Sequence, residues 1–168
     1  MKAISLWQPC ASLMAAGIKT IETRSWSTSY RGPLLICAAK HTEWDTFLYR
    51  HVKTSPEIVA FLKSHAGGYP EGVALAVVDL YDVNRTEATF PTTLERALGK
   101  YTPQRFAWLT RNCRPLAKPI PVRGRQRLFN VQIWAGQLSI ESTARERPNP
   151  FEAVKKILAE STITEIQP

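Results

Sequence analysis

The sequence alternates short apolar segments of strand-like composition with turns marked by proline and glycine. "KAISLW" alternates as an opening strand does, with Ile4 and Leu6 on the same side. "RGPLLICAAK" indicates a turn and then a strand buried on both faces, and "VALAVVDLYDV" is the longest strand candidate. Strands that are short and often interrupted predict an α+β domain built around a small β-barrel or a strongly bent sheet.

Further strand candidates come from the segments "TIETRSW", "RFAWLTRNCRPL", "KPIPVRG" and "LFNVQIW". Around Pro119 and Pro121 the chain must run at a sheet edge or outside the ladder, because proline has no N–H to donate. The pattern therefore predicts that the sheet ends or is interrupted in this part of the chain.

Helical patterns are fewer. "QPCASLMAAG" predicts a short helix with Pro9 near its first position and Gly17 as its stop. Residues 43–65 carry helical spacing, with a helix start at Ser55-Pro56-Glu57, and "NPFEAVKKILAE" is typical of an amphipathic helix. The regular strand-helix alternation of a doubly wound fold is missing, as is a glycine-rich phosphate loop.

The length of 168 residues suits one domain with a short appendage. No apolar run has the roughly 20 residues that a membrane span needs, and "MKAISLWQPC" is not a signal peptide, so we expect no membrane partner and a cytoplasmic location. Cys10, Cys37 and Cys113 are odd in number and far apart, as free thiols are. We expect neither a metal nor a cofactor, and the oligomeric state is left open.

The positive charge is concentrated in one part of the sequence. The net charge is +8, and residues 96–140 hold nine Lys/Arg and no acid, while residues 1–95 hold nine of each sign. A patch of one sign is what a polyanion-binding face needs, because each neutralised phosphate releases counterions. The alternative is a set of scattered, solvated charges.

The segment "GIKTIETR" places three charged residues close together. In a strand that begins near Thr20, Glu22 and Arg24 share one face, and Lys19 stands just before it. Gly17 allows a sharp turn from the preceding helix. These charges form either a solvated strand edge or a site in which Glu22 fixes a neighbouring cation.

This segment fits the motif Gly-x-Lys-x-x-Glu-x-Arg, and by it the chain resembles the ASCH domain family, named for activating signal cointegrator homology and related to the PUA domain. "ISLWQPCASLMAAGIKTIETRSWSTSYRGPLLICAAK" and "PIPVRGRQRLFNV" are similar to segments of single-domain ASCH proteins of bacteria and phages. The resemblance covers roughly residues 2–134. It implies a PUA-like barrel of five to six strands with flanking helices. Residues 1–137 would form this domain, and residues 138–168 a C-terminal extension with one amphipathic helix.

The resemblance also implies a cleft that binds RNA or other nucleic acid, with Gly17, Lys19, Glu22 and Arg24 carried over as cleft residues. Some ASCH proteins are amidohydrolases that deacylate N4-acetylcytidine with a Lys, a Thr and a Glu, and others have been described as ribonucleases. Lys19 matches that lysine, Glu22 occupies the threonine position, and Asp79 is the candidate for the third residue.

Each candidate residue has more than one interpretation. Lys19 is a phosphate anchor, a catalytic base or nucleophile, or half of a structural ion pair. Glu22 orients Lys19 or accepts from a base, and Arg24 binds phosphate or stacks. Asp79 is a catalytic acid or a half-exposed strand carboxylate.

In the sequence, the aromatic candidates come before the longest strand candidate and the arginine candidates come after it. Trp26 and Tyr30, in the polar loop "SWSTSYRG", are the stacking candidates, since each stacked base is worth about 1–3 kcal/mol. Trp7 and Trp108 are assigned to the core. The run "RGRQR" supplies a phosphate clamp or three solvated arginines, which are Arg123, Arg125 and Arg127.

The leading hypothesis is a protein that binds RNA or single-stranded nucleic acid, with a small base or nucleoside cleft at the motif. The alternative is an amidohydrolase of N4-acylated cytosine nucleosides, with Lys19, Glu22 and Asp79 as catalytic residues. A ribonuclease and a protein-interaction module that docks through the C-terminal helix complete the alternatives.

Overall fold

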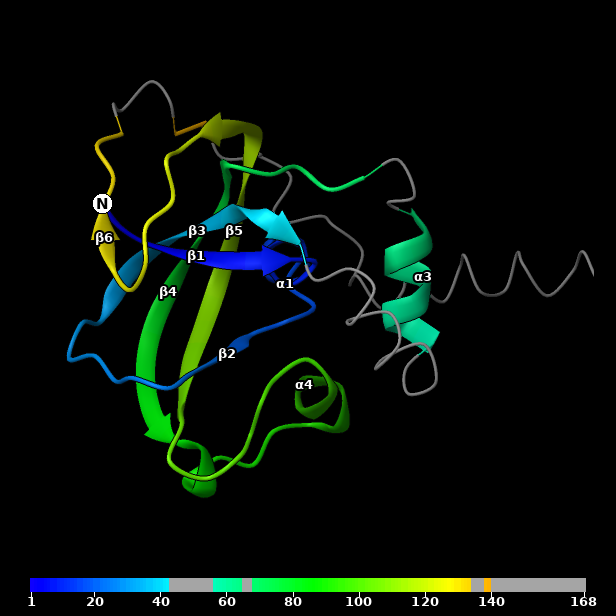
Figure 1. Cartoon of the computed structure of the whole chain (residues 1–168), viewed down its shortest axis with the longest axis vertical. Helices are drawn as coiled ribbons and strands as arrows, with labels where there is room; N and C mark the ends of the chain where they lie inside the picture. The colour runs from blue at the N-terminus through cyan, green and yellow to red at the C-terminus, as the bar shows by residue number, and fades with distance from the viewer. Residues whose placement is uncertain (43–55, 65–67, 134–137, 140–168) are drawn as a thin grey trace, which may run out of the picture.

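The computed structural model describes residues 1–42, 56–64, 68–133 and 138–139 (Figure 1). The described strands are β1 (Lys2–Gln8), β2 (Ile21–Arg24), β3 (Gly32–Thr42), β4 (Val73–Arg85), β5 (Phe106–Pro121) and β6 (Phe129–Asn130). The described helices are α1 (Cys10–Ala15), α3 (Pro56–Ser64), the 3-10 turn η1 (Thr86–Ala88) and α4 (Thr93–Ala97).

All six strands belong to one sheet in the order β2-β5-β4-β3-β1-β6. β1 and β3 pair in parallel, and the other pairs are antiparallel. The α+β class and the strand number match the expected PUA-like barrel, but hydrogen bonds do not close the sheet. The edge strands β2, which has four residues, and β6, which has two, lie at opposite ends of the strand order and do not pair with each other.

The sheet bends because its long central strands carry irregularities. The β4–β5 pairing shifts register three times, between Ala74 and Ala76, between Val77 and Asp79, and between Leu80 and Asp82. An extra residue on one strand kinks that strand and raises its local twist. The two ribbons therefore curve together across the molecule (Figure 1).

β3 is the core strand that its apolar sequence predicts. Leu34 and Ile36 pack in one cluster with Trp108, while Leu35 and Cys37 pack in a second cluster on the other face. These residues are at most 2% exposed. Burial raises the pKa of the Cys37 thiol to about 12, so this cysteine stays a neutral apolar side chain.

The predicted short helix forms as α1, and Gly17 turns the chain after it. Gly17 has φ +74°, a left-handed conformation that favours glycine, and the N–H groups of Ile18 and Lys19 both bond to the Leu13 carbonyl oxygen. The Cys113 thiol, from β5, donates to the Met14 carbonyl oxygen at 3.2 Å. The sheet thus supports the helix end that leads into β2.

Sequence analysis missed α4, which a cap defines. The Thr92 hydroxyl accepts from the Glu95 N–H at 3.2 Å, and "TTLE" carries the Ser/Thr-x-x-Glu start signal. The Glu95 carboxylate bonds outside its own helix: it accepts from the N–H groups of Thr20 and Ile21 and from the Thr20 hydroxyl. α4 thereby anchors the start of β2.

The second half of the sheet differs from its prediction in one respect. "RFAWLTRNCRPL" and "KPIP" form one strand, β5, rather than two. β2 pairs only with Phe106–Leu109, so among the described strands the proline-rich end of β5 pairs with β4 alone and lies at an edge, as expected.

The helix predicted from Ser55-Pro56-Glu57 is present as α3, which packs Ile58 and Phe61 against Leu13 of α1. The earlier part of the helical pattern, residues 43–55, and the amphipathic helix of the predicted extension lie outside the described residues. None of the helices in the described ranges has the length and apolar character needed to cross a bilayer.

Candidate functional site

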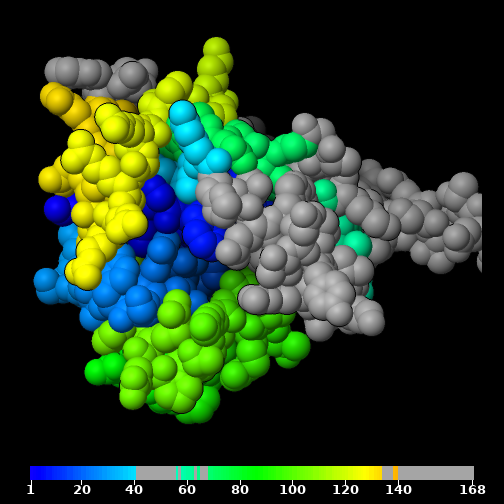
Figure 2. Space-filling model, in the orientation of Figure 1, coloured from blue at the N-terminus to red at the C-terminus, as the bar shows by residue number. Residues whose placement is uncertain are grey.

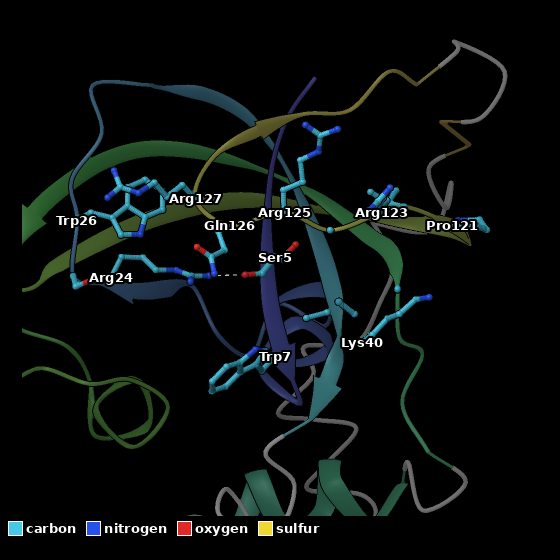
Figure 3. Close-up of a pocket in the computed structure, with 16 residues that line it drawn as sticks. Ser5, Trp7, Arg24, Trp26, Lys40, Pro121, Arg123, Arg125, Gln126 and Arg127 are labelled. Carbon is cyan, nitrogen blue, oxygen red and sulfur yellow. Dashed lines mark hydrogen bonds between the residues drawn. The ribbon is translucent and has the colours of Figure 1, made fainter.

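A cleft of about 1100 Å³ opens where β1, the end of β3, the chain after β2 and the loop after β5 meet (Figure 3). Its cationic lining residues are Arg24, Lys40, Arg123, Arg125 and Arg127. Two indoles, Trp7 and Trp26, lie at the same cleft, and none of the described residues that line it is acidic. It is a concave, positively charged surface with aromatic sides.

The loop after β5, residues 122–128, forms one wall of the cleft and is held close to the sheet. The Val122 N–H donates to the Gly72 carbonyl oxygen at 2.9 Å. A Cβ atom at Gly124 would lie 2.8 Å from the Ser5 hydroxyl oxygen, so only glycine allows this approach to β1 without a shift. In Figure 2 the yellow segment that contains this loop stands over blue β1.

Trp26 fixes the end of that loop. Its ring meets Trp108 edge to face, with centroids 4.6 Å apart at 81°, and its carbonyl oxygen accepts from the Trp108 indole at 3.3 Å. The Arg127 guanidinium lies 6.0 Å from the Trp26 ring centroid, within range of a cation–π contact. Trp26 therefore joins the buried core to the cationic wall.

The motif residues form a chain of charges that ends at the cleft. The Arg24 guanidinium donates to the Ser5 carbonyl oxygen at 2.8 Å, and its Nε lies 3.1 Å from the Glu22 carboxylate. The other Glu22 oxygen lies 3.5 Å from the Lys19 ammonium. Glu22 and Arg24 share a strand face, as the alternation predicts, and Glu22 holds both cations.

Lys19 does not reach the cleft. Its side chain is 0% exposed, and besides Glu22 it donates to the carbonyl oxygens of Ile21 and Leu98. An ammonium group has three hydrogens, and three acceptors surround it. Of the three roles considered from sequence, these contacts fit the structural ion pair.

The other cleft cations have no such compensation. No described acid lies within ion-pair distance of Lys40, and the same is true of Arg123, Arg125 and Arg127. Two arginines outside the cleft are neutralised, Arg31 by Asp82 at 3.2 Å and Arg114 by Asp79. Of the nine cations in residues 96–140, Arg123, Arg125 and Arg127 are the three that line the cleft.

Asp79 and Tyr30 lie outside the cleft lining. Asp79 accepts both guanidinium arms of Arg114 and the Asn112 amide at 2.9 Å, and these hydrogen bonds lower the pKa of Asp79 to about 2 against the opposing effect of burial. The Tyr30 hydroxyl donates to the Pro33 carbonyl oxygen. Burial, and then the charge of Asp79, raise the pKa of Tyr30.

The structure therefore brings together only part of the predicted site. Arg24, Trp26 and the three arginines of "RGRQR" line one cleft. Lys19 and Glu22 stand behind it, and Gly17 makes the turn before them. No group of three or more His, Cys, Asp or Glu side chains that could hold a metal ion occurs in the described part of the chain.

Sequence analysis missed Trp7, Lys40 and Gln126 as cleft residues. Trp7 was assigned to the core, and this is wrong, since it is 49% exposed. The signal was present: Trp7 follows Ser5 at a spacing of two on β1, opposite the buried Ile4 and Leu6. Trp108 is fully buried, as assigned.

The ASCH domain family model matches residues 4–120. Activating signal cointegrator 1 from Homo sapiens is 27% identical over 157 residues, which cover 85% of this chain and 23% of that protein, and the Mus musculus protein gives the same values. The chain thus spans less than a quarter of the length of these relatives. The crystal structure of an ASCH point mutant from Zymomonas mobilis has a TM-score of 0.50 at 14% identity, covering 93% of this chain and 96% of that one, which is a likeness of fold.

Lys19→Met should lower the free energy of unfolding by about 3 kcal/mol, the lower end of what breaking a buried charged pair costs. In this variant Glu22 still pairs with Arg24, but the carbonyl oxygens of Ile21 and Leu98 lose the ammonium group that donates to them. Urea unfolding measures the effect, and Lys40→Met, the same change at an exposed cleft position, should leave stability unchanged. Wild-type stability in Lys19→Met together with a loss of ligand binding would instead make Lys19 a ligand residue.

Arg114→Gln should raise the pKa of Asp79 from about 2 toward its ordinary value of 3.8, because the largest lowering effect is removed. A depressed carboxyl pKa stabilises the fold above about pH 4, and this stabilisation is lost as the pH falls toward about 2. The variant should therefore lose less stability in that window. Carbon-13 NMR titration of Asp79 checks the pKa, and Arg111→Gln, whose charge effect on Asp79 is the smallest, should shift it less. An unmoved Asp79 titration would refute the assignment to Arg114.

Proposed function

This chain belongs to the ASCH domain family, and from that premise we propose that it binds RNA or other single-stranded nucleic acid in the cationic cleft. The observation that carries the proposal is the composition of the lining: five cations, two tryptophans and no described acid. A polyanion that also carries flat, stackable rings is the ligand class that matches this combination.

The charges support phosphate contacts. Four of the five cations lack an acidic partner in the described part of the chain, so they can neutralise phosphates without first giving up an ion pair. Arginine suits this role because its planar guanidinium group can bond two phosphate oxygens at once. Arg123 and Arg125 are exposed and separated by a glycine, which leaves their side chains room to follow a backbone.

The two tryptophan side chains favour a single strand over a duplex as the ligand. Bases must be unstacked to lie on an aromatic side chain, and unstacking a base in a single strand requires less free energy than in a duplex. Trp7 exposes about half of its surface at the cleft, while Trp26 is partly buried and held by Trp108. The resemblance to RNA-binding members of the family points to the same ligand class.

The catalytic alternatives have less support. The cleft lining holds no histidine, cysteine or carboxylate among the described residues, so it offers no evident general base. Lys19 is enclosed by three acceptors, and Asp79 is ion-paired outside the cleft. The interaction module rests on the predicted extension, which lies almost wholly outside the described residues.

Arg123→Ala and Arg125→Ala should each weaken binding to single-stranded oligonucleotides of every sequence. Each lost phosphate contact should reduce the slope of log affinity against log salt by about 0.7. Fluorescence anisotropy across a salt series measures both quantities. Lys118→Ala is the matched control, since Lys118 is exposed and belongs to the same basic window but does not line the cleft. An equal loss in the Lys118 variant would move the binding face away from the cleft.

Incubation of the wild-type protein with N4-acetylcytidine should release no cytidine, because the lysine that the amidohydrolases use is buried here. Chromatography of the nucleosides reads the result. Turnover that Arg123→Ala leaves intact would contradict the binding proposal and make hydrolysis the function.

A further inference from the structure

Gln126 is the one amide side chain in the described lining of the cleft, and arginines precede and follow it. It is exposed, and no described residue makes a hydrogen bond to its amide. In Figure 3 the Gln126 side chain points from the loop toward the Arg24 guanidinium, with Trp26 on one side of this pair and Trp7 on the other.

The backbone that carries Gln126 is fixed on both sides. Gly124 lies against Ser5 of β1, and Val122 bonds to Gly72. Arg127 has φ +60° and places its guanidinium over Trp26. A loop that is held at these points places the Gln126 amide at a defined position in the cleft lining.

The cationic neighbours of Gln126 can bond the acceptors of a base, as arginine does with guanine, but they cannot bond the amino groups of adenine or cytosine. Arginine and lysine side chains only donate, and contacts to phosphate carry no sequence information. Arg24 is also committed to Ser5 and Glu22. A base edge presents donors and acceptors side by side, and an amide matches both, as glutamine does when it pairs with adenine.

We propose that Gln126 is a specificity-determining residue that reads the edge of one unpaired base, while Trp7 provides a stacking face and the cleft cations hold the flanking phosphates. This inference rests on the proposed function and assigns the choice of base to a single side chain. The ligand is then a single strand with a preferred base at one position.

The experiment compares labelled octamers of adenylate, cytidylate and uridylate by fluorescence anisotropy at one salt concentration. The wild-type protein should separate its best and worst octamer by about five-fold or more, which corresponds to the lower value of a good amide–base pair. Gln126→Leu should bring these affinity ratios close to one without changing the salt slope.

Gln126→Glu keeps an acceptor, loses the donor and adds a negative charge. All three octamers should bind more weakly, and uridylate should lose most, because carboxylates accept from the amino groups that cytosine and adenine carry. Gln132→Leu and Gln132→Glu make the same changes at an exposed glutamine outside the cleft lining and should leave the ratios unaltered.

Two outcomes are decisive and distinguishable. If the wild-type protein binds none of the octamers, the proposed function fails and this inference fails with it. If it binds them in a salt-dependent manner but Gln126→Leu retains the wild-type ratios, or no ratios exist to be lost, nucleic-acid binding stands and the role of Gln126 is overturned.

Discussion

The arrangement of the cleft depends on one buried ammonium group. Lys19 donates to Ile21 at the start of β2 and to Leu98 beyond α4, and it faces Glu22, whose carboxylate also holds Arg24. These contacts join the turn after α1, the short strand β2 and the segment that carries α4. A four-residue edge strand has few ladder hydrogen bonds of its own, so charged groups at its base add directly to its placement. The family motif thus builds the support behind the cleft, and Arg24 is the motif residue that lines it.

Most arginines of the cleft differ from Arg114, which is paired with an acid. On β4 and β5, Asp79 binds Arg114 across the strands, and this pairing is the largest cause of the depressed pKa of Asp79. At the cleft the cations have no described acid beside them, apart from Arg24. Self-repulsion among such groups destabilises a compact fold, so they are expected where a ligand later supplies the missing charge. A net charge from sequence cannot make this distinction, because only the fold decides which arginines meet a carboxylate.

Much of the fold follows from local pattern, and the site only in part. Strands such as β3 could be predicted because a continuous apolar run must be buried on both faces. α4 was missed because its five residues carry little periodicity, although its capping signal is in the sequence. Arg24 and the arginines of the β5 loop could be singled out by charge. The burial of Lys19 could not be predicted, since it results from contacts with Leu98, which is 79 residues away.

The two walls of the cleft come from opposite ends of the described chain. Ser5 and Trp7 lie on the first strand, while the arginine loop precedes β6, which pairs with the start of β1 and is joined there by the mutual bonds of Met1 and Val131. During synthesis the chain therefore has Trp7, Arg24 and Lys40 long before it has the three arginines of the loop after β5. The loop that carries Arg123, Arg125 and Arg127 is the last part of the cleft lining to be made, so the cleft is complete only after this loop has folded back onto β1.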